Sequence, residues 1–256
     1  MRVAIITGAA QGIGRRTAEL LASAGYSLAL LDLKSCASTL AAARVHGGDA
    51  DEFIGDLSVE QTVSRIIDDV RDRWHQVDVL VNNAGISFIA PVEDSNAQAF
   101  RRVLEVNLVA PFLLSKAVGK LMLERGSGSI VNVASIAGLM GICDRSAYNA
   151  SKHGLLGLTR TLAAEWGGRG VRCNAVCPGW VKTEMDVVDQ AGGDYTDEDI
   201  TGRNAMGRFA TPDDITRAIL FLTDARQSGF INGQALPVDG GWSVDGSWQS
   251  LRMQHR

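Results

Sequence analysis

Tyr148 and Lys152 stand four residues apart in a stretch whose pattern predicts a helix. This spacing places a phenol and an ammonium on one helical face, one turn apart. A phenol with its ordinary pKa of about 10 is a poor base at neutral pH. A fixed positive charge nearby lowers that pKa, so such a tyrosine could take a proton from an alcohol or give one to a carbonyl. The same pair occurs by chance in many helices, so its meaning depends on the elements around it.

Strand-like and helix-like segments alternate along the chain. Short apolar runs rich in β-branched residues predict strands, and longer amphipathic runs predict helices. The predicted strands span Val3–Thr7, Ser27–Asp32, Glu52–Ile54, Val77–Val81, Ser129–Val133, Val171–Val176 and Ala235–Val238. The predicted helices span Gly12–Ala24, Ser35–Val45, Val59–Trp74, Ala97–Leu123, Ala147–Trp166 and Pro212–Leu222.

Continuous apolar strands separated by helices indicate a parallel sheet that is covered on both faces. We therefore expect an α/β fold with a doubly wound, mostly parallel sheet of about seven strands, Rossmann-like. The chain of 256 residues has no Pro/Ser linker, which favours one domain over residues 1–242 and a tail over residues 243–256. Lys182–Arg208 is polar and punctuated by glycine, so we expect a mobile loop with short helices there.

Composition narrows the class of protein and its partners. The net charge of −4 gives no electrostatic reason to expect nucleic acid or an anionic membrane as a partner. No apolar run approaches the roughly 20 residues that span a bilayer. The His and carboxylate residues show no ligand spacing, so we expect no metal. The four cysteines form no CxxC pair, which favours buried thiols in a reducing cytoplasm; they are Cys36, Cys143, Cys173 and Cys177.

A glycine-rich turn, Thr7–Gly14, joins the first predicted strand to the first predicted helix. Glycines there permit a tight turn and a close approach of the backbone to a pyrophosphate, and the helix N-terminus offers unpaired N–H groups. The spacing is G-x-x-x-G-x-G, and the alternative is a plain connection. In this strand–turn–helix context the turn favours nucleotide binding, with contacts expected from Gly8, Gln11, Gly12, Ile13 and Gly14.

Asp32 ends the second predicted strand, where a carboxylate can accept hydrogen bonds from the adenosine ribose hydroxyls. A 2′-phosphate would meet a like charge there, so Asp32 favours NAD over NADP as the cofactor. The alternative is that this carboxylate only caps a helix or is solvated. Arg15 and Arg16 could approach a phosphate, but both lie on the first helix and could equally be solvated.

Several motifs in register resemble the short-chain dehydrogenase/reductase family, in its single-domain branch. They are the glycine turn, Asn82-Asn83-Ala84-Gly85, Asn107, Ser135, Tyr148-x-x-x-Lys152 and Pro178-Gly179, and the match runs from Arg2 to about Trp242. The resemblance implies a catalytic tetrad of Asn107, Ser135, Tyr148 and Lys152. In it Ser135 holds the substrate oxygen, Tyr148 exchanges the proton, and Lys152 lowers the tyrosine pKa and binds the nicotinamide ribose. Asn107 positions a water that links Lys152 to solvent.

The resemblance also assigns further cofactor contacts. Asp56 and Leu57 resemble the adenine contact after the third strand. The adenosine side is assigned to Asn83, Ala84 and Gly85, and the nicotinamide-side loop to Pro178, Gly179, Val181 and Thr183. Trp180 departs from the family, because many members carry a smaller or aliphatic residue there. It would narrow the substrate pocket or supply an apolar wall.

The substrate is expected to be small and polar. Arg145 lies three residues before Tyr148 and could bind a substrate carboxylate bidentately; the alternative is a surface ion pair with Asp144 or another acid. A polar loop at Lys182–Arg208 suits a hydroxylated substrate better than a hydrophobic one. We therefore expect Ser135, Arg145, Tyr148 and Trp180 to contact the substrate.

The leading interpretation is an NAD-dependent enzyme that transfers a hydride between the nicotinamide and a secondary alcohol or ketone. The substrate would be a sugar, a polyol or a sugar acid such as a 2-keto-3-deoxy sugar acid. One alternative is a 3-oxoacyl thioester reductase, which shares these motifs but favours NADP and a basic residue in the glycine turn or after the second strand. Gln11 and Asp32 disfavour it. Another is a catalytically silent NAD-binding regulator, against which the intact Ser/Tyr/Lys set argues.

The resemblance further implies an assembly. Members of this family are commonly tetramers joined through two long helices, here Ala97–Leu123 and Ala147–Trp166, so we expect a homotetramer. The tail continues past the last strand with Trp248 and Arg252. It could lie near a neighbouring subunit's pocket, and the alternative is a frayed terminus.

Overall fold

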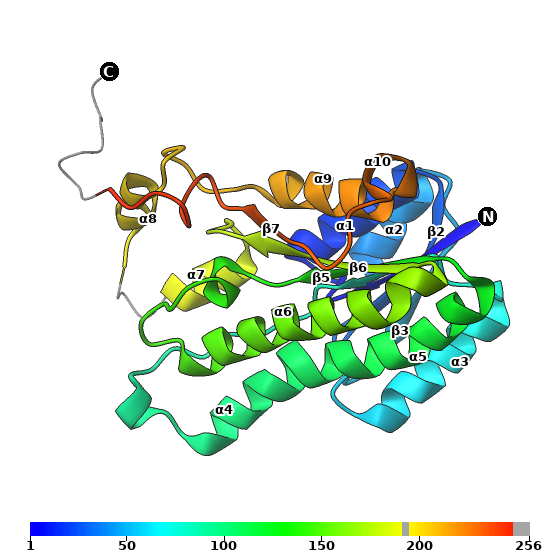
Figure 1. The fold of residues 1–256 in the computed structure, drawn as a ribbon, viewed down its shortest axis with the longest axis horizontal. Coiled ribbons are helices and arrows are strands. Elements are labelled where there is room, and N and C mark those ends of the chain that lie inside the picture. Colours follow the sequence, from blue (N-terminus) through cyan, green and yellow to red (C-terminus); the bar gives the residue numbers. More distant parts are fainter. Residues whose placement is uncertain (191–194, 248–256) are drawn as a thin grey trace.

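The chain folds around one parallel sheet with helices on both of its faces (Figure 1). The structure is a computed structural model that describes residues 1–190 and 195–247. Trp248 and Arg252 therefore lie outside the described residues. In the described part the sheet has the order β3-β2-β1-β4-β5-β6-β7, and each neighbouring pair is parallel. The expected doubly wound α/β fold is confirmed.

The strands lie close to the positions expected from their apolar runs. Their bounds are β1 Arg2–Thr7, β2 Tyr26–Asp32, β3 Ala50–Ile54, β4 Val79–Asn82, β5 Gly128–Val133, β6 Val171–Pro178 and β7 Ala235–Val238. Strands β1, β2 and β4 are buried along nearly their whole length, as expected for a sheet that is covered on both faces. Because both faces of these strands are buried, their apolar runs are continuous in the sequence.

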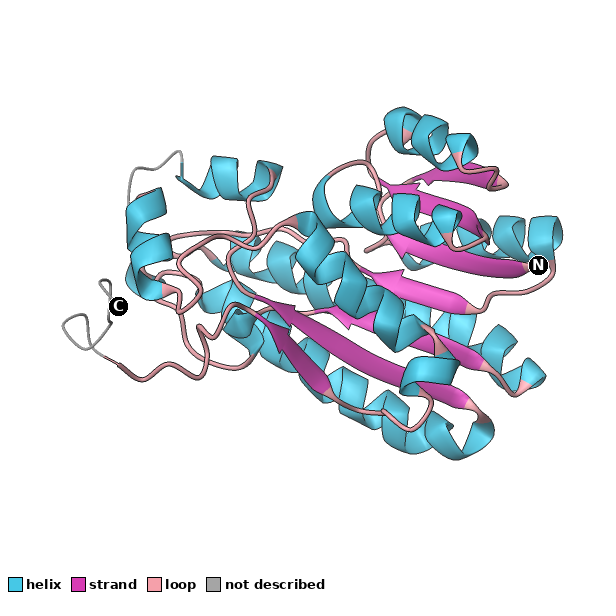
Figure 2. Cartoon of the chain, turned by 90° about the horizontal axis from the view of Figure 1, so that it is seen from above, coloured by secondary structure: helices cyan, strands magenta, loops and turns pink. Residues whose placement is uncertain are grey.

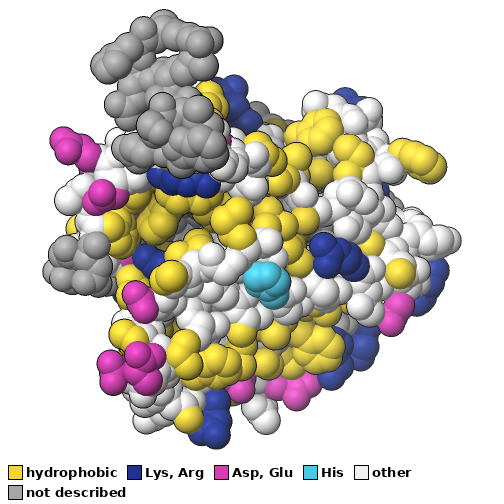
Figure 3. Space-filling view, turned by 60° about the vertical axis from the view of Figure 1, so that its left-hand side comes forward, with side chains coloured by type: hydrophobic (Ala, Val, Ile, Leu, Met, Phe, Trp, Pro, Cys, Tyr) yellow, Lys and Arg dark blue, Asp and Glu magenta, His cyan; other side chains and the backbone are white. Residues whose placement is uncertain are grey.

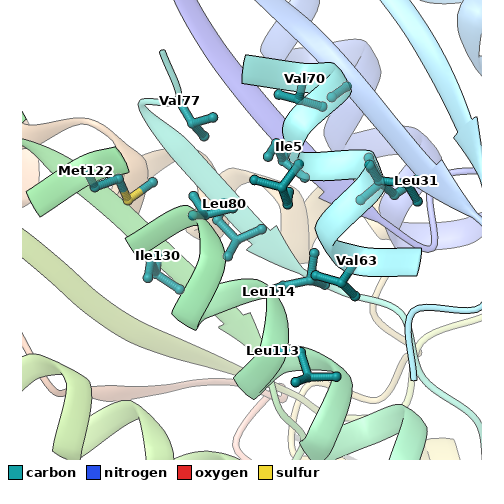
Figure 4. Packing of buried hydrophobic residues seen from close by; sticks show 14 of the residues in the cluster. Ile5, Leu31, Val63, Val70, Val77, Leu80, Leu113, Leu114, Met122 and Ile130 are labelled. Atoms are coloured by element: carbon teal, nitrogen blue, oxygen red, sulfur yellow. The ribbon is translucent and has the colours of Figure 1, made fainter. Parts of the chain in front are cut away.

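Alternate residues of a strand point to opposite faces, and β1 therefore contributes to two cores. Val3 and Ile5 pack with side chains from α3, α5 and α6, whereas Ala4 and Ile6 pack with side chains from α1, α2 and α9. Figure 2 shows the helices on either side of the sheet, and Figure 4 shows the first core around Ile5. Each fully buried Ile or Leu side chain stabilises the fold by roughly 1.5–3 kcal/mol.

The helices agree with the expected ones to within a few residues. They are α1 Gly12–Ser23, α2 Ala37–Val45, α3 Glu60–Trp74, α4 Ala97–Leu104, α5 Ala110–Arg125, α6 Ser146–Trp166, α7 Glu184–Gln190, α8 Asp197–Arg203, α9 Pro212–Thr223 and α10 Ala225–Ser228. Capping boxes begin α8 and α9, in which a threonine and an aspartate exchange hydrogen bonds. The expected short helices in Lys182–Arg208 are α7 and α8.

One expected helix, Ala97–Leu123, has a different geometry from a regular α-helix. Residues Glu105–Val109 form a π turn, η2, between α4 and α5, and the helical run continues to Arg125. By length and composition alone this run of 29 residues could cross a membrane, contrary to the expectation that no such run exists. Its Leu114 and Met122 are instead buried in the core against the sheet.

The order of the strands reverses between β1 and β4. In open parallel sheets, ligands bind outside the carboxyl ends of the strands at such a reversal. The glycine turn follows β1, Asn83 follows β4, and Ser135 follows β5. The fold therefore brings the motif residues, which are far apart in the sequence, to one edge of the sheet.

Candidate active site

A cavity of about 430 Å³ lies at the carboxyl edge of the sheet. Nearly every residue expected to bind cofactor or substrate lines it. These residues are Gly8, Gln11, Gly12, Ile13, Asp32, Asp56, Leu57, Asn83, Ala84, Gly85, Ser135, Arg145, Tyr148, Lys152, Pro178, Gly179, Trp180, Val181 and Thr183. Of the residues expected in the site, Gly14 and Asn107 do not belong to the lining of this cavity as described.

The glycine turn is held against β4 by a hydroxyl and an amide. Thr7 Oγ1 accepts hydrogen bonds from the backbone N–H groups of Asn83 and Ala84, both at 2.9 Å. Asn83 Nδ2 donates to the carbonyls of Thr7 and Gly8 at 2.9 and 3.2 Å. A Cβ on Gly14 would lie 2.0 Å from the Gly8 carbonyl oxygen, so Gly14 is required for the packing of the turn rather than for a contact with the ligand.

The start of α1 has the features of an anion site. Gly8 and Gly12 adopt positive φ angles of 64° and 54°, which brings bare backbone to the cavity. In the described structure Gln11 makes no side-chain cap, and the first turn of α1 has no acidic residue. The first N–H groups of α1 can therefore serve a pyrophosphate, and the residues present fit a dinucleotide.

Asp32 is fixed above this turn by two backbone groups. Its Oδ2 accepts a hydrogen bond from the Ala10 N–H and its Oδ1 accepts one from the Lys34 N–H, both at 3.0 Å. The two arginines that could have opposed it are paired elsewhere. Arg15 pairs with Glu19, and Arg16 pairs with both Glu19 and Asp213. The negative charge of Asp32 therefore faces the cavity without these two counterions.

The adenosine end contains two basic residues that the sequence reasoning did not identify. Lys34 lines the cavity two residues past Asp32. Its place directly after the second strand could have identified it from the sequence. Arg102, on α4, donates to Asp56 Oδ2 at 3.0 Å and to Ser58 Oγ at 2.8 Å. Hydrogen bonds from Ser58 and Arg102 lower the pKa of Asp56. No local pattern predicts the Arg102 contact, because it joins residues 46 positions apart.

Tyr148, Ser135 and Lys152 meet in the cavity as expected. Lys152 is 3% exposed, its Nζ donates to the Val133 carbonyl at 2.8 Å, and burial lowers its pKa to about 8. The same Nζ lies 5.5 Å from the centre of the Tyr148 ring. Ser135 Oγ accepts a hydrogen bond from the Ala137 N–H at 3.1 Å, and Ser135 also hydrogen-bonds the Tyr148 side chain.

The groups that act on the Tyr148 pKa in the protein alone include a cation that the resemblance did not assign, Arg145. Burial raises the pKa of Tyr148, the hydrogen bond with Ser135 and the charge of Arg145 lower it, and Asp189 raises it. Lys152, which the resemblance assigned to lowering this pKa, is not among these causes in the protein alone. Its ammonium is directed at the Val133 carbonyl instead. In the protein alone Arg145 is therefore the cation that favours the phenolate.

Asn107 is fully buried in the π turn. Its Oδ1 accepts a hydrogen bond from the Ile86 N–H at 2.9 Å, and its Nδ2 donates to the Ile86 carbonyl at 2.9 Å and to Ser151 Oγ at 3.1 Å. Both amide hydrogens are thus used inside the protein. The side chain fixes the segment after Gly85 and the helix that carries Lys152, so it acts on the site by positioning.

The substrate end is built around Arg145, which is 7% exposed. Its Nη1 donates to Asp189 Oδ2 at 2.8 Å and to Ser87 Oγ at 3.0 Å, and its guanidinium lies 5.5 Å from the centre of the Trp180 ring. The alternative of an ion pair with Asp144 or another acid therefore holds for another acid, Asp189 of α7, and the pair lies mostly inside the protein instead of at its surface. Trp180 forms the expected wall and packs on Tyr195 and Trp242 at ring-centre distances of 5.1 and 5.9 Å.

Comparison with known proteins gives consistent matches over almost the whole chain. Residues 8–243 match the family model described as Enoyl-(Acyl carrier protein) reductase. The chain is 41% identical over 249 residues to a D-threitol dehydrogenase of Mycolicibacterium smegmatis, covering 95% of this chain and 93% of that one. It is 40% identical over 248 residues to 2-(S)-hydroxypropyl-CoM dehydrogenase 3 of Xanthobacter autotrophicus, covering 94% and 96%.

A solved structure gives the same result for the fold. It is the crystal structure of a candidate NAD(P)-dependent gluconate 5-dehydrogenase from Beutenbergia cavernae, with NADP bound at low occupancy. The TM-score is 0.90 at 39% identity, over 95% of this chain and 97% of the other.

Proposed function

Because this chain belongs to the short-chain dehydrogenase/reductase family, which makes it an oxidoreductase that uses a nicotinamide cofactor, we propose a specific reaction for it. The reaction is the NAD-dependent interconversion of a secondary alcohol and a ketone in a small polar substrate, a sugar, polyol or sugar acid. The observation that carries this proposal is Tyr148, whose phenol is hydrogen-bonded to Ser135 in the cavity and lies beside Lys152.

Each residue of the site has its own role in the proposed oxidation of the alcohol. Ser135 holds the substrate oxygen, and the Tyr148 phenolate takes the hydroxyl proton while the carbon–hydrogen bond breaks. A nicotinamide held in the cavity would supply the acceptor for the hydride that leaves this carbon. Lys152 would hold the nicotinamide ribose and the turn at Gly8 and Gly12 would hold the pyrophosphate, while Asn107 holds the surrounding backbone. In the reverse direction Tyr148 returns the proton to the carbonyl oxygen.

The proposed preference for NAD rests on Asp32. Its carboxylate is fixed at the end of β2 by two backbone N–H groups, where a 2′-phosphate would meet its charge. Lys34 is the residue that opposes this preference, because it lines the same end of the cavity. The candidate gluconate dehydrogenase carries NADP at low occupancy, so the preference for NAD proposed for this chain depends on its own local charges, above all that of Asp32.

The proposed substrate class is supported by the cavity and by the relatives. Polar side chains line its substrate end, including Arg145, Asp186 and Asp189. D-threitol is a polyol and gluconate is a sugar acid, and the relatives are named for these compounds. The 3-oxoacyl thioester reductase remains the second candidate within the family. Gln11 in the glycine turn and Asp32 favour the first candidate over it, since that reductase favours NADP.

A turnover assay tests the proposal. Purified protein is assayed with NAD and NADP against polyols, sugar acids, simple secondary alcohols and a 3-oxoacyl thioester. We expect kcat/KM with NAD to exceed that with NADP by more than about tenfold, which corresponds to roughly 1.4 kcal/mol. Asp32→Ala should reduce this ratio, and Lys34→Ala should increase it. Equal efficiency with both cofactors, or turnover of the thioester alone, would reject the proposal.

The proposal also covers the cellular compartment and the binding partners of the enzyme. Three of the four cysteines are buried and all four are free thiols, which suits a reducing compartment, and we propose the cytoplasm. The proposed partners are a small-molecule substrate and further copies of the same chain. Localisation of a tagged full-length chain by fractionation tests this setting directly.

A further inference from the structure

Glu184, the first residue of α7, carries a carboxylate to the glycine turn of the cofactor site. A Cβ on Gly12 would lie 3.4 Å from Glu184 Oε2 and 3.6 Å from Thr183 Cγ2. Gly12 is the first residue of α1, and the first turn of that helix contains no acidic residue of its own. The fold therefore brings a carboxylate from a distant part of the sequence to the helix N-terminus that can receive the pyrophosphate.

No ion pair neutralises this carboxylate in the part of the chain that the structure describes. Glu184 is exposed, and it lines both the cofactor cavity and a second cavity of about 500 Å³ beside α1. The cations that line the second cavity, Arg15, Arg16 and Lys182, pair with other acids. The charge of Glu184 therefore acts on the start of α1 without these counterions.

This carboxylate opposes the binding of a dinucleotide whether it stays in place or moves. A pyrophosphate brings negative charge to the first N–H groups of α1. If Glu184 stays beside Gly12, the two like charges repel each other. If its side chain moves away, it gives up a favourable interaction with the N-terminus of α1. Both cases make binding less favourable, by an amount that corresponds to about fivefold in Kd.

A purely structural role of Glu184 makes a different prediction. An acid in the first turn of α7 stabilises that helix through its dipole, and Asp186 lies in the same turn. Such a role would change the melting temperature of the protein. It would change neither the affinity for a pyrophosphate nor the dependence of this affinity on salt.

We propose that Glu184 weakens the hold of the α1 N-terminus on the dinucleotide and thereby speeds the release of the reduced cofactor. A dehydrogenase must release this product in every turnover, and product release limits kcat in many enzymes. The inference needs only the nicotinamide dinucleotide that the family uses. It involves neither the alcohol nor the choice between NAD and NADP, so it and the proposed function can fail independently.

The experiment measures binding to Glu184→Gln, which keeps the size of the side chain and removes its charge. ADP-ribose is the first probe, because it contains the pyrophosphate but no nicotinamide. By calorimetry at about 0.02 M NaCl, its Kd should be about fivefold lower for the variant than for the unmodified protein. At about 0.5 M NaCl the two Kd values should agree within about twofold, because salt screens the charge.

The rate of release is the second readout. Dissociation of the reduced cofactor, NADH or NADPH according to which one the protein binds, is followed by stopped-flow fluorescence. It should be about fivefold slower from Glu184→Gln than from the unmodified protein. Glu124→Gln is the matched control, because it makes the same change at an exposed position of α5 outside the lining of both cavities. It should alter neither the Kd nor the dissociation rate.

Three results would overturn the inference. The first is an unchanged Kd for ADP-ribose, including the case in which only the melting temperature of Glu184→Gln changes. The second is a Kd that falls by the same factor at both salt concentrations, because an effect of charge is screened by salt. The third is a lower Kd with an unaltered dissociation rate, which would exclude a role in release.

Discussion

Tyr148 is half-buried between groups that act on its pKa in opposite directions. Burial and Asp189 raise the pKa, whereas Ser135 and Arg145 lower it. The net result in the protein alone is a raised pKa, so the phenol holds its proton more tightly than a free tyrosine and its phenolate is a stronger base. The Arg145–Asp189 pair, which belongs to the substrate end, also sets the proton affinity of the base.

The first prediction concerns the proton itself. Tyr148→Phe keeps the ring but removes the exchangeable proton, so kcat should fall by at least about 10²-fold. Binding of NAD, measured by fluorescence titration, should survive because the ring and Lys152 remain. A variant that retains most of its turnover would exclude Tyr148 as the acid and base.

The second prediction concerns pH. Oxidation needs the phenolate, so kcat/KM for oxidation should rise with pH through the Tyr148 pKa. Arg145→Met removes a charge that lowers this pKa and should move the rise to higher pH. Asp189→Asn removes a charge that raises the pKa and should move the rise to lower pH. Shifts of the same sign in both variants would contradict the assignment, and Asp72→Asn, on the exposed face of α3, should not shift the profile.

At the scale of elements, the sequence predicted the sheet well because its strands are continuous apolar runs. Val3–Thr7 and Ala235–Val238 were found within one residue of the structure. The contacts that set local charge could not be found this way. Asp189 meets Arg145 across 44 positions, and only the folded arrangement of α6 and α7 brings them together.

The π turn illustrates the same limit within one helix. The apolar pattern of Ala97–Leu123 predicts an ordinary helix, but the structure has the i+5 pattern of a π turn at Glu105–Val109, where the Ala110 N–H donates to the Glu105 carbonyl. Such turns often occur at functional sites. Here the turn carries Asn107 inward to Ile86 and Ser151, which are distant in sequence. Its position follows from these tertiary contacts.

The third prediction belongs to this element. Asn107→Ala leaves the Ile86 N–H and carbonyl and Ser151 Oγ without these partners in a buried site. The free energy of unfolding should fall by about 1–3 kcal/mol, measured by urea denaturation. Gln61→Ala, at an exposed position on α3, is the control and should change it little. An Asn107→Ala variant as stable as the unmodified protein would show that these hydrogen bonds contribute little to the free energy of unfolding.

At the scale of the molecule, the helices on one face leave apolar surface uncovered. Phe112, on α5, is 46% exposed, and α4 packs against α6 on this side of the sheet. Figure 3 shows hydrophobic side chains gathered in patches on the face that it presents. Exposed apolar patches of this kind often form contacts between proteins.

The fourth prediction is that the protein is a homotetramer in solution. Light scattering at micromolar concentration should give about four times the mass of one chain, because closed symmetric assemblies bury such surfaces. Phe112→Glu should reduce this mass, whereas Glu93→Gln, at a solvent-exposed turn, should not. A monomeric mass for the unmodified protein would reject the prediction.

The placement of Asp189 on α7 has an evolutionary consequence. Helix α7 stands outside the sheet and both main cores, so a change there alters the pocket while the folding free energy is largely supplied elsewhere. One nucleotide change turns an aspartate codon into an asparagine codon. Because Asp189 balances the charge of Arg145 at the cavity, this single mutational step changes the charge that the pocket presents to a substrate. The charge of the pocket can therefore change in evolution while the two main cores stay the same.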